Sequence, residues 1–203
     1  GFGSLLAEMA DSFSPKEVSE MGEAILKGGT RLHRLIENYL LYIQIELQQN
    51  VIQDSVAADK LEAVCFDTAY SLARNHNREN DLVIQMEAAN LKISEELLRK
   101  SLQEITDNAF RFSQKNSKIL IHGSVQNNYY ELIVQDHGIG MFADDIKRIG
   151  AFMQFDRDKN EQQGSGLGLV IVQRIMEIIG GSMEIKSKKE KWTRIKLRIP
   201  IAK

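Results

Sequence analysis

The spacing of apolar and polar residues divides the chain into two parts of different character. The first part is dominated by one long helical pattern, from Ser14 to about residue 49, in which apolar residues return every seven positions. Ser14 suits the helix N-cap and Pro15 suits the first helical position. Two rows run along this predicted helix: Val18, Ile25, Leu32 and Tyr39 in one, and Gly22, Gly29, Ile36 and Ile43 in the other.

The heptad helix is expected to belong to a helical hairpin. Residues 1–11 have the apolar spacing of the end of an earlier helix, and the sequence DSFSP predicts the turn between the two. The pair Gly28-Gly29 is expected to weaken or bend the long helix. Because so narrow a hairpin cannot bury its apolar seam, we expect two copies of the chain to form a four-helix bundle. The alternative is that the hairpin packs on the second part of the chain.

In the second part, after LQQNVIQDSVAAD has lost the heptad pattern, short apolar runs alternate with helical patterns. Helices are predicted around residues 60–77, from about 95 to 114, and over about 167–180, with a short helical piece within 142–163. Strands are predicted around 82–86 and 90–93, in a hairpin of SKILIHGSV and YYELIVQD turning at Asn127-Asn128, and in two closing strands ending at Pro200. This grouping predicts an α+β two-layer sandwich. We therefore expect two domains, residues 1–52 and residues 53–203.

Composition narrows the class of protein without identifying it. The 203 residues are 43% hydrophobic and 27% charged, which is an ordinary globular balance. A net charge of −2 supports neither nucleic-acid binding nor electrostatic contact with a membrane. The longest apolar run is too short to span a bilayer, and the sequence as given has no segment that we expect to be a signal peptide. The single cysteine, Cys65, excludes an internal disulfide framework and fits a reducing compartment.

The predicted helix LLRKSLQEITDNAFRFS carries a polar row beside an apolar one. Its apolar stripe consists of Leu98, Leu102, Ile105, Ala109 and Phe112. Glu104, Asn108 and Arg111 are also spaced by four and three residues, so they lie on the shoulder of the same stripe. Such a row either borders a pocket or is an ordinary solvated helix face.

Two polar residues occupy apolar positions at the ends of predicted strands. Asp136 is in phase with Leu132 and Val134, and Thr193 is in phase with Ile195. This phase predicts that both polar groups point into a pocket. The alternative for Asp136, which precedes the sequence HGIGM, is a turn-forming role before glycine.

A third candidate element is the sequence GSGLGLVIV, residues 164–172. Gly164, Gly166 and Gly168 open directly into a predicted helix, where free backbone N–H groups can bind an anion such as phosphate. The spacing is not the dinucleotide-binding pattern. Arg157 and Lys159 in the preceding polar segment strengthen the case for an anion site.

The four motifs EITDNA, DHGIGM, FMQF and GSGLGL, in this order and at these separations, resemble the ATP-binding domain of sensor histidine kinases. That domain belongs to the ATPase superfamily of gyrase, Hsp90, histidine kinases and MutL. The resemblance covers essentially the whole chain, because the heptad helix resembles the second helix of the kinase dimerisation hairpin and GFGSLLAEM the end of its first helix. It implies a Bergerat-type fold, the cofactors ATP and Mg²⁺, a homodimer through the hairpin and a response regulator receiver domain as partner. It also implies a cytoplasmic segment, with any membrane anchor upstream of Gly1.

The resemblance assigns roles to individual residues. Asn108 matches the ligand of the Mg²⁺ that bridges the phosphates. Glu104 matches the water-activating carboxylate of the gyrase and Hsp90 relatives, or else an outer partner of the metal. Asp136 matches the acceptor of the adenine amino group, and Gly138 and Gly140 would let the backbone approach the ring. Further nucleotide contacts are implied for Arg111, Ile139, Met141, Phe152, Phe155, Arg157, Gly164, Ser165, Gly166, Leu167, Gly168 and Thr193.

The implied reaction is phosphoryl transfer from MgATP to a histidine of the hairpin and then to an aspartate of a response regulator, beneath a mobile lid over residues 142–163. The family's phosphoacceptor motif, a histidine followed by an acidic residue, Arg, Thr and Pro, is absent and is expected upstream of Gly1. His33, His76, His122 and His137 do not match it, so this chain is expected to bind ATP without phosphorylating itself. The alternatives are a pseudokinase or nucleotide-dependent interaction module, and a gyrase- or Hsp90-type ATPase, which Glu104 favours.

Overall fold

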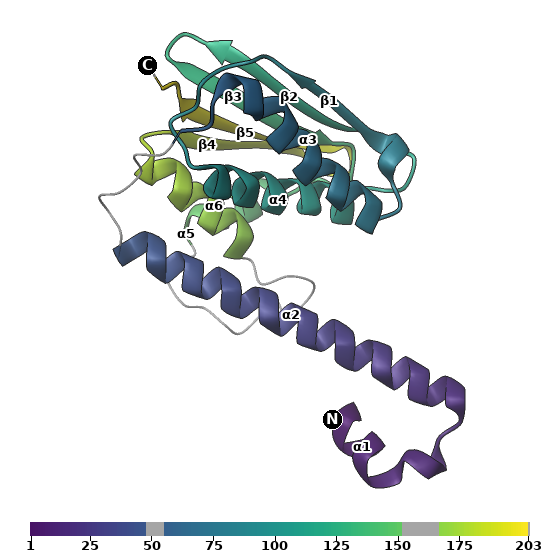
Figure 1. Cartoon of the computed structure of the whole chain (residues 1–203). Helices are drawn as coiled ribbons and strands as arrows, with labels where there is room; N and C mark the ends of the chain where they lie inside the picture. The colour runs from purple at the N-terminus through teal and green to yellow at the C-terminus, as the bar shows by residue number, and fades with distance from the viewer. Residues whose placement is uncertain (48–54, 152–166, 203) are drawn as a thin grey trace.

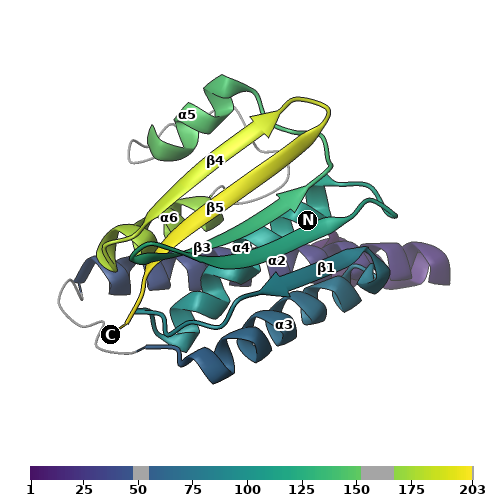
Figure 2. The same cartoon turned by 90° about the horizontal axis from the view of Figure 1, so that it is seen from above.

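The computed structural model of the chain describes residues 1–47, 55–151 and 167–202, and its centre is one five-stranded β-sheet (Figure 1). The spatial order is β1-β2-β3-β5-β4, in which β1 is parallel to β2 and the other neighbours are antiparallel. The strands are β1 (Leu82–Met86), β2 (Ile119–Gln126), β3 (Tyr129–Asp136), β4 (Ser182–Lys188) and β5 (Trp192–Pro200). Helices lie against one face of the sheet (Figure 2): α3 (Ala58–Asn75), α4 (Glu95–Phe112) and α6 (Leu167–Ile178). The predicted α+β two-layer sandwich is confirmed.

The core lies between the sheet and these helices, as the two periodicities of the sequence require. Every second residue of β3 is buried, and the same holds for β5 from Thr193 onwards. The predicted apolar stripe of α4 meets that face, and Leu98, Leu102 and Ile105 are fully or almost fully buried. Cys65 of α3 also lies in this core, where burial raises the pKa of its thiol to about 12. The thiol is therefore a packing group rather than a nucleophile.

The N-terminal segment forms the predicted helical hairpin, with α1 (Phe2–Met9), a 3₁₀ turn (Ala10–Ser12) and α2 (Pro15–Leu47). The Ser14 hydroxyl accepts the Glu17 amide at 3.3 Å, while the Glu17 carboxylate accepts the Ser14 amide at 2.8 Å, which is a reciprocal capping box. Helix α2 runs through Gly28 and Gly29 without a break. Two glycines lower the stability of a helix by about 2 kcal/mol relative to alanine, and a helix of 33 residues can form despite that loss.

The two ends of α2 differ in how they are packed. Its C-terminal part lies beneath the helical layer (Figure 1), where Asn38 and Ile45 are buried and Leu41 and Tyr42 pack on the core. Before this part, from Val18 to Ile36, the apolar residues of the heptad seam are exposed, with Leu32 59% and Ile36 48% exposed. The alternative, that the hairpin packs on the rest of the chain, thus holds for the C-terminal part of α2, and the seam before it lacks a cover within the described residues.

The strand predicted at residues 90–93 is wrong, because Leu91 makes only isolated bridges, to Val56 and to Ile201. The reason is local, because the Ile93 amide donates to the Leu91 carbonyl at 3.0 Å and turns the chain towards α4. The predicted domain boundary at residues 52 and 53 lies outside the described residues and stays a prediction.

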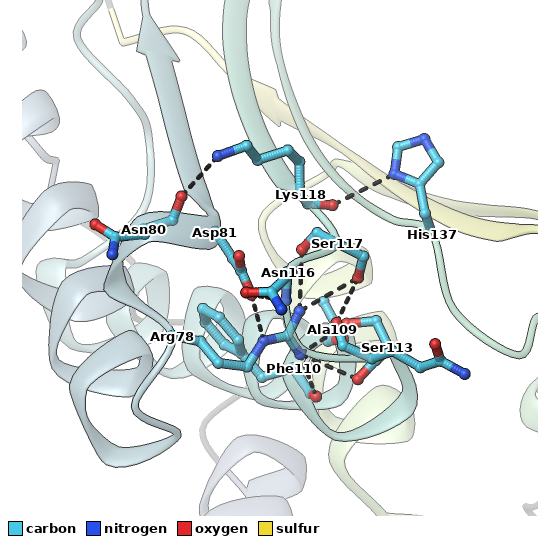
Figure 3. Close-up of polar contacts among 11 residues, drawn as sticks. Arg78, Asn80, Asp81, Ala109, Phe110, Ser113, Asn116, Ser117, Lys118 and His137 are labelled. Carbon is cyan, nitrogen blue, oxygen red and sulfur yellow. Dashed lines mark hydrogen bonds and ion pairs between the residues drawn. The ribbon is translucent and has the colours of Figure 1, made fainter.

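One buried arginine joins the start of β1 to the end of α4 (Figure 3). Arg78 precedes the 3₁₀ turn Glu79–Asp81, and its guanidinium donates to the Asp81 carboxylate at 2.7 Å and to the Phe110 carbonyl at 2.9 Å. It also reaches the carbonyls of Ser113 and Ser117, at 3.1 and 3.0 Å. Arg78 thereby donates hydrogen bonds to the carbonyls of Phe110 and Ser113, which the end of α4 leaves without intrahelical partners.

Candidate functional site

A cavity of about 220 Å³ lies between α4 and the ends of β3 and β5. Its wall is mostly apolar, with a few polar groups converging on it, as is typical of a small-molecule site. Residues on the lining are Ile105, Asn108, Ala109, Phe112, Val134, Asp136, Ile139, Gly140, Met141, Asp145, Lys189, Thr193 and Ile195. The structure therefore brings together predicted site residues that are up to 85 positions apart, from Asn108 to Thr193.

Of the polar row of α4 (Glu104, Asn108 and Arg111), only Asn108 lines the cavity. Asn108 lines it, Glu104 lies one turn earlier and is only 2% exposed, and Arg111 lies outside the lining. The Arg111 guanidinium is 3.9 Å from the Asp107 carboxylate and stacks 5.8 Å from the Phe112 ring centroid. Of the three predicted residues, Asn108 is thus the one that reaches the cavity directly in this structure.

Asp136 is a carboxylate held inside the cavity, and it also forms the turn before glycine that was its alternative role. It is 6% exposed and pairs across the sheet with Thr193, and its Oδ1 accepts the Gly138 amide at 2.8 Å. Burial raises the pKa of Asp136 to about 6. Its ordinary pKa is about 4, so between these values the folded chain binds more protons than the unfolded chain. The free energy of unfolding consequently falls as the pH rises through this window.

The loop after Asp136 is pressed against the protein at both glycines. A Cβ atom at Gly138 would collide with the Phe112 carbonyl, and one at Gly140, whose φ is +61°, would collide with the Lys188 carbonyl. The Ile139 amide donates to the Phe112 carbonyl at 3.0 Å, which fixes the loop to the end of α4. These glycines are therefore required by contacts within the chain, and their approach to an adenine ring stays a prediction.

Ser187 is a site residue that the sequence did not reveal. Its hydroxyl accepts the Met141 amide at 2.8 Å, donates to the Trp192 carbonyl at 2.8 Å and lies 3.1 Å from the Thr193 hydroxyl. It thus ties the loop to β5 and orients Thr193 at the cavity wall. Only the pairing of Ser187 with Thr193 in the β4–β5 register identifies it.

Asp145 and Lys189 also line the cavity and were not predicted. Asp145 belongs to the short helix α5 (Ala143–Ala151), and Lys189 to the turn between β4 and β5. The Lys189 ammonium lies 4.7 Å from the ring centroid of Phe142. No local motif marks either residue, because only the fold brings the turn and the helix to one opening.

The predicted glycine-rich element is described from Leu167, where α6 begins. A Cβ atom at Gly168, in the first turn of α6, would collide with the Glu104 carboxylate, so this glycine lets α4 and α6 approach closely. The other residues predicted here lie outside the described residues: Phe152, Phe155, Arg157, Lys159, Gly164, Ser165 and Gly166. Their contacts with a nucleotide stay predictions.

The polar groups of the cavity suit a metal that arrives with its ligand better than a metal held by the protein alone. Among the described residues no three His, Cys, Asp or Glu side chains come together as metal ligands. Mg²⁺ bound with phosphates commonly takes only one or two protein oxygens, and the Asn108 amide at the cavity wall can supply one. Within the same residues no helix is long and apolar enough to cross a lipid bilayer.

Comparison with known protein families gives one match over the second part of the chain. The family model described as histidine kinase-, DNA gyrase B-, and HSP90-like ATPase matches residues 93–203. That range contains α4, α5, α6 and strands β2 to β5, and every residue that lines the cavity falls within it.

Curated relatives extend the similarity into the hairpin. The signal transduction histidine-protein kinase ArlS of Staphylococcus epidermidis is 25% identical over 174 residues, which cover 84% of this chain and 38% of that protein. The histidine protein kinase DivJ of Caulobacter vibrioides is 26% identical over 192 residues, which cover 90% and 31%. The chain thus spans about a third of the length of these relatives.

Solved structures share the fold at low sequence identity. The histidine kinase AdeS of Acinetobacter baumannii has a TM-score of 0.71 at 19% identity, covering 100% of this chain and 94% of that chain. Full-length ShkA in complex with AMPPNP has a TM-score of 0.71 at 20% identity, covering 94% and 40%. The hairpin and the sandwich are therefore both found in known structures.

Proposed function

The chain belongs to the histidine kinase-, DNA gyrase B- and HSP90-like ATPase family, and we propose that it forms the ATP-binding catalytic region of a two-component sensor histidine kinase. The observation that carries this proposal is a carboxylate, Asp136, buried at the end of an apolar cavity that Asn108 also lines. An ionised carboxylate accepts hydrogen bonds and offers none, so it is suited to an exocyclic amine and unsuited to phosphate.

This proposal assigns roles to predicted residues that line the cavity. Asp136 accepts a hydrogen bond from the adenine amino group, and Thr193 lies beside it across the strand pair. Ile139 and Met141 cover the ring, while Asn108 supplies an oxygen to Mg²⁺. The bound metal neutralises phosphate charge during transfer, and the chain's own contribution is to position the nucleotide and exclude water.

Asn108→Ala is expected to lower phosphohistidine formation at least about 100-fold, because the site loses its metal-positioning oxygen. The measurement uses the protein at its natural length with γ-labelled ATP and Mg²⁺, and detects acid-labile phosphate. Gln103→Ala is the matched control, since Gln103 is an exposed residue of the same helix. No label in the native protein, with nucleotide binding intact, would instead indicate a pseudokinase.

The ATPase alternative depends on Glu104, and the contacts of that residue weigh against it. A general base must be able to reach water, whereas the Glu104 carboxylate is buried and accepts the Lys100 ammonium at 2.8 Å. We therefore place the ATPase below the kinase. Multiple-turnover hydrolysis that Glu104→Ala abolishes would reverse this order.

We further propose that the exposed seam of α2 forms a homodimer, as a helical hairpin in this family would. Leu32→Glu/Ile36→Glu is expected to weaken dimerisation by at least about 100-fold, because two carboxylates would be buried in an apolar seam. Sedimentation equilibrium measures the dissociation constant. Lys27→Glu is the control: it also changes the charge by two units, but the heptad count places it opposite the seam. A native chain that is monomeric at all concentrations would contradict the proposal.

The remaining parts of the function follow from the kinase proposal. The phosphoryl group would pass from the hairpin to an aspartate of a response regulator receiver domain, in the cytoplasm. The four histidines of this chain do not match the family's acceptor motif; His33 is exposed beside Glu37, and His76 bonds to Asp107 at 2.9 Å. The division into a hairpin of residues 1–52 and a catalytic domain of residues 53–203 is part of the same proposal.

A further inference from the structure

A partly buried ammonium group connects the hairpin helix α2 to the catalytic layer. Lys100 of α4 donates to the Asn38 side-chain carbonyl of α2 at 2.6 Å and to the Glu104 carboxylate at 2.8 Å. Asn38 is fully buried, Glu104 is 2% exposed and the Lys100 side chain is 18% exposed. Charges that are withdrawn from water to this degree need partners of opposite charge or good hydrogen bonds. Each member of this triad (Asn38, Lys100 and Glu104) therefore constrains the other two.

The far side of the triad lies against the first turn of α6. The Glu104 carboxylate is so close to Gly168 that a Cβ atom there would collide with it. The N–H groups at the start of a helix favour negative charge, so a carboxylate here competes with a phosphate for the same region unless its charge is neutralised. The Lys100 ammonium supplies that neutralisation.

The residues involved also follow one line along α4. Lys100, Glu104 and Asn108 are separated by four residues each, so they share one face of the helix, and Asn108 lines the cavity. A change at Lys100 is thus two helical turns from the cavity and in direct contact with the residue between them.

On the α2 side the contact is incomplete. The Asn38 amide nitrogen is buried without a hydrogen-bond partner among the described residues, whereas its oxygen accepts from Lys100. A buried donor left unsatisfied disfavours the packed arrangement. Among the described residues, the Lys100–Asn38 contact thus leaves one buried donor of α2 unsatisfied, and such a defect is typical of elements that separate reversibly.

We propose that Lys100 is a positioning residue through which the nucleotide site responds to the docking of α2. When α2 is docked, Asn38 holds the Lys100 ammonium on the Glu104 carboxylate, and the neutralised carboxylate admits the phosphates at the start of α6. When α2 leaves, Lys100 loses one of its acceptors and neutralises Glu104 less well. By linkage, nucleotide binding must favour the docked position of α2 to the same degree. The inference rests on the proposed function, because it requires phosphates at α6.

Lys100→Met is expected to weaken binding of Mg-AMPPNP about tenfold in isothermal titration, because it leaves the Glu104 charge beside the phosphates without its ammonium. Lys100→Arg, which keeps the charge, should retain most of the affinity. In a Glu104→Gln background Lys100→Met should change the dissociation constant less than about twofold, since no carboxylate then needs neutralising. A residue that only stabilised the fold would show neither the rescue nor the suppression. Lys60→Met, an exposed lysine of α3, is the control for loss of one positive charge.

The link to α2 is tested with Asn38→Leu, which keeps the volume and removes the acceptor. We expect Mg-AMPPNP affinity to fall about threefold and amide exchange in residues 38–47 to become faster, and we expect AMPPNP to slow that exchange in the native chain. Failure of the native chain to bind Mg-AMPPNP would overturn the proposed function itself. Native binding that is unchanged by Lys100→Met, or faster exchange in Asn38→Leu without a change in affinity, would overturn the inference and leave the proposed function standing.

Discussion

Replacing Asp136 with asparagine is expected to weaken binding of MgATP analogues about 100-fold and to leave the fold intact. The Asp136 carboxylate already accepts the Gly138 amide at 2.8 Å and the Thr193 amide, so its oxygens serve backbone donors as well as the ligand. Asparagine keeps one acceptor oxygen and replaces the other with an NH₂ group, which sets a donor against a donor. Loss of a hydrogen bond to a charged group, together with an unsatisfied buried donor, accounts for an effect of about 3 kcal/mol.

The matched control for this variant is Asp145→Asn. Asp145 lines the same cavity and loses the same charge, but it is exposed on α5. Titration calorimetry with Mg-AMPPNP should show a change of less than about threefold for Asp145→Asn. Equal weakening by both variants would mean that the effect is one of net charge. Unchanged affinity in Asp136→Asn would remove the adenine assignment.

The pH dependence of the same interaction gives an independent readout. Burial raises the pKa of Asp136 to about 6, and only the ionised carboxylate accepts from the adenine amine in the way proposed. Affinity for adenosine, which carries no titrating phosphate, should therefore fall as the pH drops below this value, approaching about tenfold for each pH unit. The asparagine variant should bind weakly and without this dependence.

Much of the fold could be predicted because its signals are local and periodic. The alternation along β3 and β5 identified the buried face, and the same count placed Asp136 and Thr193 on it before any contact was known. The spacing along α4 likewise predicted its apolar stripe, and of the two alternatives that it left open for the polar row, the structure places Asn108 at a pocket. The strand predicted at residues 90–93 failed because the conformation at Leu91 depends on partners far away in the sequence, Val56 and Ile201.

Contacts between segments that are far apart in the chain could not be predicted from the sequence. The resemblance assigns the glycines after Asp136 to the approach of a ring, which stays a prediction, but it gives no sign that Gly138 and Gly140 each face a carbonyl from another element. Ser187 and Lys189 lie in the basic stretch KSKKEKW, where nothing distinguishes them from solvated residues until the strand register is known. Lys100 looks like an ordinary helix-surface lysine, and only the contact with Asn38 of α2 identifies it as a partly buried charge.

Arg78→Met is expected to reduce the free energy of unfolding by about 3–5 kcal/mol, although Arg78 lies in the polar sequence HNREND, which suggests a surface turn. The Arg78 side chain is 3% exposed and that of Asp81 is 8% exposed, and their atoms Nε and Oδ2 are 2.7 Å apart. The substitution would leave the Asp81 charge buried and would free the carbonyls of Phe110, at the end of α4, and of Ser117, in the segment before β2 (Figure 3). The aliphatic stem of methionine fills part of the space, so the loss is mainly electrostatic.

Arg99→Met is the matched control, because it breaks an ion pair of similar geometry at the surface. The Nε atom of Arg99 is 2.8 Å from the Glu95 carboxylate, but the two side chains are 38% and 50% exposed. Urea unfolding should show a loss of less than about 1 kcal/mol for Arg99→Met, with the same m-value as the native chain. Equal losses in the two variants would contradict the role given to burial.

A second substitution separates the buried charge from the lost hydrogen bonds. Adding Asp81→Asn to Arg78→Met removes the uncompensated carboxylate and should restore about 1–2 kcal/mol of the lost stability, a non-additivity expected of partners in direct contact. Recovery should be partial, because Asp81 also accepts the Asn116 amide at 2.9 Å and the α4 carbonyls stay without their donor. A double variant no more stable than Arg78→Met would mean that the carbonyl contacts, rather than the ion pair, account for the stability. In that case Arg78 would act chiefly as a cap on α4, the helix end on which the Ile139 amide is anchored.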